Sequence, residues 1–182
     1  MKGGESLFAD QGDGLKEKVW NALLEVTDPE IPVLSVVDLG MIEEVQVKSG
    51  RVTIKALPTF MGCPALDIIQ KNIEEKVATV EGVKAVEVSF IFNPPWTSDR
   101  VTEEGRKKLK EFGIAPAPRF IEEDGSWTVD CPYCGSPYTT IENIFGPTAC
   151  RSLLYCKSCR NPFEAMKPVS TGYGENFSGK KG

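Results

Sequence analysis

Four cysteines in two matched C-x-x-C pairs are the residues of this sequence best suited to bind a metal ion. The pairs are Cys131 with Cys134 and Cys156 with Cys159, and 21 residues separate them. Each pair can place two sulfurs on one tight turn, and two such turns complete a tetrahedral thiolate site with Zn–S bonds of about 2.3 Å. The separation is one residue beyond the usual zinc-ribbon range. This cysteine quartet predicts a metal centre.

Structural zinc is the preferred interpretation of the quartet. Four thiolates around one ion leave no open position for a substrate. A module of roughly 40 residues is also too small to bury a sufficient core without such a centre. A rubredoxin-like iron centre, a dithiol redox pair and an Fe–S cluster are the alternatives. Two symmetric pairs disfavour thioredoxin-type chemistry, which needs one C-x-x-C only.

Cys63 is a second candidate for thiol chemistry. It lies between Gly62 and Pro64, where we expect a helix to begin. The unpaired N–H groups of a helix N-terminus favour an anion, and this placement lowers the pKa of a thiol below about 8.5. The alternative is a buried cysteine that packs as a small hydrophobic residue. Cys150 lies outside both pairs, and we expect it to pack inside the ribbon.

Two acidic residues, Asp28 and Glu30, flank Pro29 in an extended segment. Their carboxylates could ligate a metal or orient a thiolate, since alternate residues of an extended chain point the same way. The alternative is a helix-ending turn whose acids are solvated. The local sequence alone favours that alternative.

Composition excludes several classes of function. The chain has 182 residues, of which 41% are hydrophobic and 26% charged, so a packed core is expected. It contains no histidine, the commonest general acid or base at neutral pH. The net charge is −5, and residues 1–113 carry 14 basic against 19 acidic side chains. This balance lacks the basic field of a nucleic-acid-binding protein.

Hydropathy and cysteine usage predict a cytoplasmic protein. No run approaches the roughly 18–20 apolar residues of a membrane span, and the first residues contain no stretch typical of a signal peptide. In such a chain the six cysteines are more plausibly ligands and thiols than disulfides.

The pattern of apolar residues predicts helices and strands in alternation. A helix is expected to open at Asp13 or Gly14 and to end before Pro29. Further expected elements are a hairpin over 45–56, a helix over 62–82, a strand over 86–92 and a helix over 102–112. The predicted fold class is α+β, a small two-layer sandwich of helices on a mixed sheet, followed by a small zinc-ribbon β module.

A proline-rich stretch at 115–118 and a polar turn at 122–126 mark the expected domain boundary. The predicted division is a flexible N-terminus over 1–14, an α+β domain over 15–114, a proline-rich and acidic linker over 115–130, a zinc ribbon over 131–168 and a flexible tail over 169–182.

Several longer motifs resemble known families. Residues 28–41 (DPEIPVLSVVDLGM), followed by 59–64 (TFMGCP), resemble the SufT-like family of small domains associated with Fe–S assembly. Residues 95–99 (PWTSD), 104–116 (EGRKKLKEFGIAP) and 145–156 (FGPTACRSLLYC), with both cysteine pairs, look like the PaaD family (also called PaaJ) of phenylacetate degradation. The resemblance covers roughly residues 15–168.

The resemblance implies a non-catalytic accessory protein that assists Fe–S cluster or metallocentre assembly of the phenylacetyl-CoA epoxidase, a ring-epoxidising monooxygenase. It assigns Asp28, Glu30, Thr59 and Cys63 to the SufT-like motif, and the quartet to the metal site. The implied metals are structural zinc, with iron as the alternative, and iron or an Fe–S cluster held transiently at Cys63. The implied partners are the oxygenase or reductase subunits and the Fe–S assembly machinery, with neither nucleic acid nor membrane. Self-association into a homodimer stays open.

Three other functions compete with this interpretation. The first is a structural subunit that stays bound in the oxygenase complex, and fixed stoichiometry on co-purification would favour it. The second is a zinc-ribbon nucleic-acid-binding protein, whose binding would be salt-dependent. The third is an enzyme acting through the Cys63 thiolate, for example on a thioester, and turnover by the isolated protein would favour it.

Overall fold

The structure is a computed structural model that describes residues 10–60, 62–119, 121–122 and 125–169. Residues 1–9 and 170–182, most of the termini that the sequence predicts to be flexible, lie outside the described residues. The elements in chain order are α1 (Asp10–Leu24), β1 (Ile42–Lys48), β2 (Arg51–Ala56), α2 (Leu66–Ala78), β3 (Ala85–Phe90), the 3₁₀ turn η1 (Ser98–Arg100), α3 (Glu103–Glu111), β4 (Ile114–Ala115), β5 (Thr139–Asn143), β6 (Arg151–Cys156) and β7 (Pro162–Met166).

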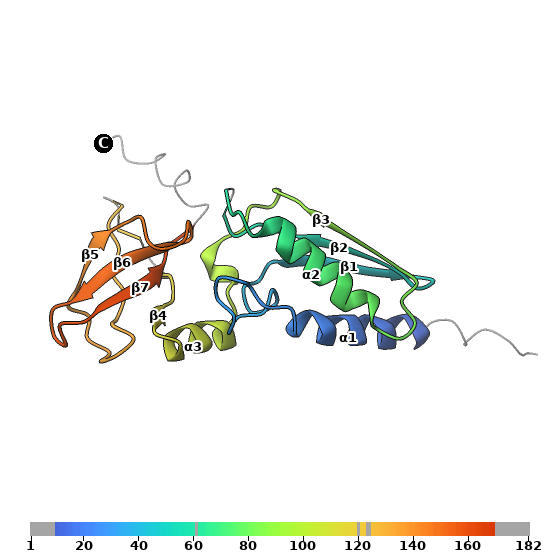
Figure 1. The fold of residues 1–182 in the computed structure, drawn as a ribbon, viewed down its shortest axis with the longest axis horizontal. Coiled ribbons are helices and arrows are strands. Elements are labelled where there is room, and N and C mark those ends of the chain that lie inside the picture. Colours follow the sequence, from blue (N-terminus) through green and yellow to red (C-terminus); the bar gives the residue numbers. More distant parts are fainter. Residues whose placement is uncertain (1–9, 61, 120, 123–124, 170–182) are drawn as a thin grey trace, which may run out of the picture.

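The first sheet has the order β1-β2-β3, with β1 antiparallel and β3 parallel to β2. A two-residue turn joins β1 to β2, and Ser49 and Gly50 both have positive φ there, as primed hairpin turns require. The parallel pair needs a crossover, which α2 supplies. Helices α1 and α2 contact each other and lie along the sheet in Figure 1. The predicted α+β fold with a mixed sheet is confirmed.

The helix boundaries differ in part from the sequence prediction. Helix α1 begins at Asp10, three residues before the predicted start at Asp13. Helix α2 begins at Leu66 with Ala65 as its N-cap, so the prediction that it begins at Gly62 was wrong. The reason is local: Cys63 lies in a turn before the helix, where its N–H donates to the Phe60 carbonyl at 3.2 Å.

The third helix follows its prediction closely. Thr102 is the N-cap of α3, and its hydroxyl accepts a hydrogen bond from the Gly105 N–H at 3.0 Å. Gly113 follows the helix with φ of 89°, a conformation that glycine adopts without steric cost. The cap and the glycine fix both ends of α3 by local chemistry.

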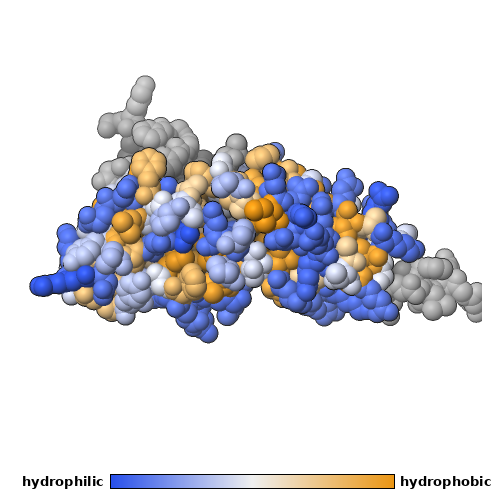
Figure 2. Space-filling model, viewed as in Figure 1, coloured by the Kyte–Doolittle hydropathy of each residue, from blue (hydrophilic) through white to orange (hydrophobic). Residues whose placement is uncertain are grey.

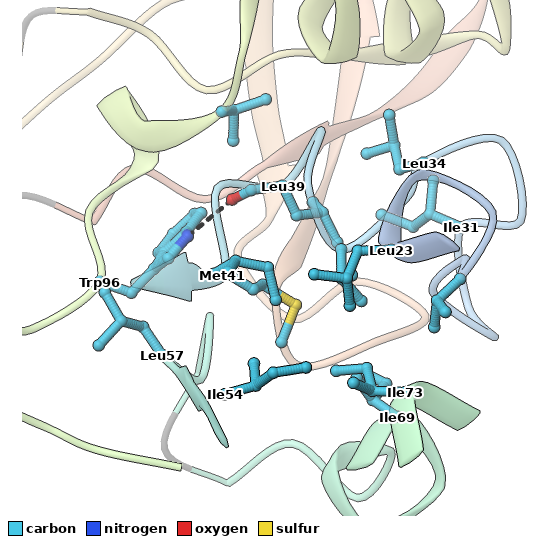
Figure 3. Close-up of a cluster of buried hydrophobic side chains, with 14 of the residues drawn as sticks. Leu23, Ile31, Leu34, Leu39, Met41, Ile54, Leu57, Ile69, Ile73 and Trp96 are labelled. Carbon is cyan, nitrogen blue, oxygen red and sulfur yellow. Dashed lines mark hydrogen bonds between the residues drawn. The ribbon is translucent and has the colours of Figure 1, made fainter. Parts of the chain in front are cut away.

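Aliphatic side chains from the helices and the sheet form the main core (Figure 3). Ile69 and Ile73 of α2 lie near Ile54 of β2, and full burial of each such side chain contributes about 1.5–3 kcal/mol. Trp96 closes one end of this core, where its indole N–H donates to the Leu39 carbonyl at 2.8 Å. The segment after β3 is thereby fixed against the loop before β1.

The second sheet has the order β4-β7-β6-β5 and forms the C-terminal module at the left of Figure 1. Strands β5, β6 and β7 are antiparallel, whereas β4 pairs in parallel with β7. Ile114, Ala117 and Met166 belong to the core cluster of the first domain, although they lie beside or within the second sheet. The two parts of the chain therefore pack against each other.

The outer surface is mostly polar over α1 and α2, with smaller hydrophobic areas between polar side chains (Figure 2). Among the described residues, no helix combines the length and the apolar character needed to cross a bilayer.

Candidate metal centre and thiol site

The four sulfurs of the quartet converge at one end of the second sheet. All four lie within 4.8 Å of one another, and this is the only group of three or more potential metal ligands so placed in the described part of the chain. The Cys131 and Cys159 sulfurs are 3.7 Å apart, and those of Cys134 and Cys156 are 3.6 Å apart. A tetrahedral centre with metal–sulfur bonds of about 2.3 Å has sulfur–sulfur edges of about 3.8 Å. The donor set therefore fits a tetrahedral thiolate-bound metal.

Both turns of the quartet have the same backbone geometry. The N–H of the residue after each pair, Gly135 or Arg160, donates to the carbonyl of the first cysteine at 2.8 or 2.9 Å. These two residues have φ of 73° and 60°. The hydroxyls of Ser136 and Ser158 lie 2.7 Å apart and connect the two turns. The matched C-x-x-C spacing thus produces two matched turns.

Two thiols of the quartet have pKa values that are shifted in opposite directions. A backbone N–H at Ser136 lowers the pKa of Cys134, but burial and the neighbouring sulfurs together raise it to about 12. Burial raises the pKa of Cys159, but hydrogen bonds from Asn161 and Cys156 outweigh it and lower the pKa to about 6. Four adjacent thiolates repel one another, so a cation is needed to hold all four deprotonated.

Cys63 is half-buried in the turn before α2, which is not the helix-tip position that the sequence predicts. The expectation of a lowered pKa was also wrong. Burial is the largest cause and raises the pKa of the Cys63 thiol, and the negative charges of Glu30 and Asp28 raise it further. The Ala65 N–H opposes these effects without outweighing them. Cys63 therefore lies in an anionic environment.

Asp28 is buried, with 8% of its surface exposed. Its Oδ1 accepts hydrogen bonds from the Glu30 N–H at 2.7 Å and the Ile31 N–H at 3.0 Å. The expectation that both acids are simply solvated was therefore wrong for Asp28, because its carboxylate closes the turn after α1. Glu30 is half-buried. The charges of Glu30 and Asp28 contribute to the raised pKa of Cys63, but in the described part of the chain these three residues do not converge as the sulfurs of the quartet do.

Thr59 is half-buried at the start of the same turn. It lines an apolar cavity of about 280 Å³ together with Phe60, Phe92 and Trp96. Thr59 therefore lies on the wall of this cavity, four positions before Cys63 in the chain.

The prediction that Cys150 packs inside the ribbon was wrong. It is not part of the ribbon's buried cluster, but lines a small cavity with Thr59, Phe60 and Trp96 of the first domain. Burial raises the pKa of its thiol, and the charges of Asp28 and Glu30 contribute to this increase. The sequence signal that could have identified this position is that Cys150 lies outside both C-x-x-C pairs but within the motif at 145–156.

The quartet and Cys150 lie at opposite ends of β6. Cys156 is the last residue of this strand, and Cys150 directly precedes its first residue. Six residues of extended chain span about 20 Å. The quartet is thus remote from Cys150.

Two family models match the chain. Residues 16–90 match the model described as iron-sulfur cluster assembly protein, and residues 115–167 match the PaaD zinc beta ribbon domain. A protein of Escherichia coli K12 that is named as one of the subunits of 1,2-phenylacetyl-CoA epoxidase is 39% identical over 153 residues, which are 84% of this chain and 92% of that protein. The chain belongs to the PaaD family.

Two shorter proteins match the first domain alone. The Fe–S protein maturation auxiliary factor of Porphyromonas gingivalis is 41% identical over 95 residues, which are 52% of this chain and 90% of that protein. The crystal structure of a DUF59 domain from Bacillus anthracis covers 56% of this chain and 96% of its own, with 27% identity and a TM-score of 0.53. The first domain therefore has the fold of these single-domain relatives, to which the PaaD family adds the ribbon.

Proposed function

We propose that this chain is a non-catalytic accessory protein that assists Fe–S cluster or metallocentre assembly of a phenylacetyl-CoA epoxidase. The observation that carries the proposal is the match of residues 16–90 to the model described as iron-sulfur cluster assembly protein, and the charges of Asp28 and Glu30 that act on Cys63 support it. A thiol and two carboxylates repel one another once ionised, and a divalent cation removes that repulsion. Such a group is suited to accept ferrous iron or a nascent cluster as cargo.

The quartet has a different role in this proposal. Its closed tetrathiolate geometry supports a resident structural ion, zinc or iron, that completes the fold of the ribbon. The relatives named as Fe–S protein maturation factors lack the ribbon region in their matches, whereas the relative named as part of the epoxidase includes it. We therefore assign metal transfer to the first domain, and recognition of the oxygenase or reductase to the ribbon.

The test is to produce the epoxidase subunits together with wild-type or Cys63→Ser protein and to measure the metal content of the purified subunits. We expect Cys63→Ser to lower di-iron or Fe–S occupancy of one partner at least tenfold while the accessory protein stays folded. Glu30→Gln is expected to have a smaller effect, and Glu87→Gln, at an exposed acid of β3, none. Normal occupancy of both partners with Cys63→Ser would contradict the proposal.

A stably bound structural subunit is the second candidate, favoured by the name of the E. coli relative. Size-exclusion chromatography of the assembled epoxidase separates the two functions. A structural subunit stays with the catalytic subunits at a fixed ratio, and Cys63→Ser leaves their metal content unchanged.

A further inference from the structure

The side chain of Lys167 connects the ribbon to the first domain. Lys167 directly follows Met166, the last residue of β7. Its Nζ lies over the Phe60 ring of the first domain, 5.9 Å from the ring centroid, and over the Phe145 ring of the ribbon, at 5.5 Å. An ammonium group within about 6 Å of an aromatic centroid is attracted to the face of the ring. One cation therefore contacts two aromatic rings, one from each domain.

Hydrogen bonds on both sides hold this ammonium group in place. Lys167 Nζ donates to the Ala149 carbonyl at 3.0 Å, and the Lys167 N–H donates to the Cys150 carbonyl at 2.9 Å. Two residues later, the Val169 carbonyl accepts hydrogen bonds from the N–H and the hydroxyl of Ser98, at 2.9 and 3.1 Å. The chain is thus fixed to the ribbon at Lys167 and to the first domain just after it, so the cation has a defined position.

Phe60 connects this contact to the Cys63 thiol. Its carbonyl accepts the hydrogen bond from the Cys63 N–H at 3.2 Å, so the two residues belong to one turn. Phe60 is 37% exposed and borders two cavities, of about 280 and about 10 Å³. Lys167 lines the smaller cavity together with Phe60. Because packing encloses the Phe60 ring incompletely, the attraction to the ammonium group helps to hold the ring in one position.

The contact joins the two regions of the chain that match family models. Residues 16–90, which match the model described as iron-sulfur cluster assembly protein, include Phe60 and Cys63. Residues 115–167, which match the PaaD zinc beta ribbon domain, include Phe145 and Lys167. The cation that lies over the Phe60 ring therefore comes from outside the region that contains the Cys63 turn.

We propose that Lys167 is a positioning residue through which the ribbon fixes the turn from Phe60 to Cys63 and limits access to the half-buried Cys63 thiol. The positioning follows from the contacts of Lys167, whereas its use in metal transfer rests on the proposed function. The ribbon then has a second role besides recognition of a partner. Displacement of the ammonium group from the Phe60 ring loosens the turn and exposes the thiol.

The test is the rate at which iodoacetamide alkylates Cys63 in the full-length, zinc-loaded protein, measured by peptide mass spectrometry. Lys167→Met keeps most of the length of the side chain and removes its charge, so alkylation of Cys63 should be about threefold faster. Lys167→Arg retains a cation that stacks on aromatic rings, and its rate should stay within about 1.5-fold of the wild-type rate. Lys107→Met, which removes the same charge at an exposed lysine of α3, is the matched control and should react as wild type does.

Phe60→Leu separates an effect through the aromatic ring from a general loosening of the contact between the domains. If Lys167 acts through this ring, Lys167→Met should not change the alkylation rate further in a Phe60→Leu background. An unchanged rate with Lys167→Met alone, or an equal increase with Lys167→Met and Lys167→Arg, would overturn the inference. Full additivity of the Lys167→Met and Phe60→Leu effects would overturn it as well.

The alkylation rate and the metal content of the epoxidase subunits distinguish this inference from the proposed function. If Lys167→Met speeds alkylation while Cys63→Ser leaves the metal content unchanged, the positioning role stands and the proposed function fails. If Lys167→Met leaves alkylation unchanged while Cys63→Ser lowers the metal content, the proposed function stands and the positioning role fails.

Discussion

The core cluster of the first domain contains 24 buried side chains among the described residues, whereas the ribbon's own cluster contains seven. Two of those seven are Cys131 and Cys156 of the quartet. A core of this size does not offset the conformational entropy of folding, so the ribbon depends on its metal centre. The first domain has a sufficient apolar core of its own. One chain thus combines a domain stabilised by hydrophobic packing with a domain stabilised by metal coordination.

Loss of the metal should produce the largest effect and separate the two domains. Structural zinc contributes on the order of 10–16 kcal/mol in small modules, so a strong chelator or Cys156→Ser should unfold the ribbon. The first domain should stay folded. Amide NMR spectra recorded before and after chelation would show this as loss of dispersed signals from residues 131–166 alone. Simultaneous loss of signals from β1 to β3 would contradict the division.

A substitution that creates a cavity in the core of the first domain should destabilise that domain and leave the ribbon unchanged. Ile73 is fully buried in α2, and Ile73→Ala should destabilise that domain by about 2–5 kcal/mol. Ile68→Ala, at an exposed position of the same helix, should change stability by less than about 0.5 kcal/mol. Denaturant unfolding monitored by circular dichroism would measure both. Zinc affinity of the ribbon should be the same in both variants.

Acid should weaken the first domain through Asp38. Its Oδ2 accepts hydrogen bonds from Ser35 and from Lys108 Nζ, the latter at 2.8 Å. Burial raises the pKa of Asp38, but these hydrogen bonds outweigh it and hold the pKa below its ordinary value. The stabilisation is therefore complete above about pH 4 and is lost as the pH falls toward the lowered pKa.

Asp38→Asn should cost about 1–3 kcal/mol at pH 7 and flatten the loss of stability below about pH 4. Asp99→Asn, at an exposed acid of η1, is the control. Thermal unfolding of the three proteins between pH 3 and 7 would test the prediction. A wild-type profile that the Asp38 substitution leaves unchanged would exclude this carboxylate as the cause.

The smallest effect concerns the two turns of the quartet. Gly135 has φ of 73° and no atom near the position of an added Cβ, so Gly135→Ala should cost only the left-handed conformation, about 1–2 kcal/mol. Arg160 already has a side chain at the matched position, and Arg160→Ala should cost much less. Competition with a chelator would measure zinc retention. Equal losses for both substitutions would show that the left-handed conformation is not the cause of the cost.

The parts of the structure fixed by short segments were predictable. The spacing of the quartet, the Thr102 cap and the alternation of Val45, Val52 and Ile54 correctly indicated two sulfur turns, a helix and a hairpin. Each of these depends on neighbours within a few residues, and propensity and periodicity describe such neighbours well.

The environment of Cys63 was not predictable in the same way. Its raised pKa results from burial and from charges at Asp28 and Glu30, more than 30 positions earlier in the chain. The place of Cys150 depends on pairing between β6 and β7 and on Lys167. Such tertiary contacts leave no periodic pattern in the sequence, and only the motif at 145–156 drew attention to that segment.

The contact between the two domains, to which Ile114, Ala117 and Met166 contribute, has a consequence for how the domains associate. Relatives that match the first domain alone have no matching segment for this surface. In this chain the ribbon that covers the surface belongs to the same polypeptide. Its effective concentration is therefore set by the short connection between the domains and not by its abundance in the cell. Dilution therefore cannot separate the two halves, and whatever assembles at their junction is independent of an encounter between two molecules.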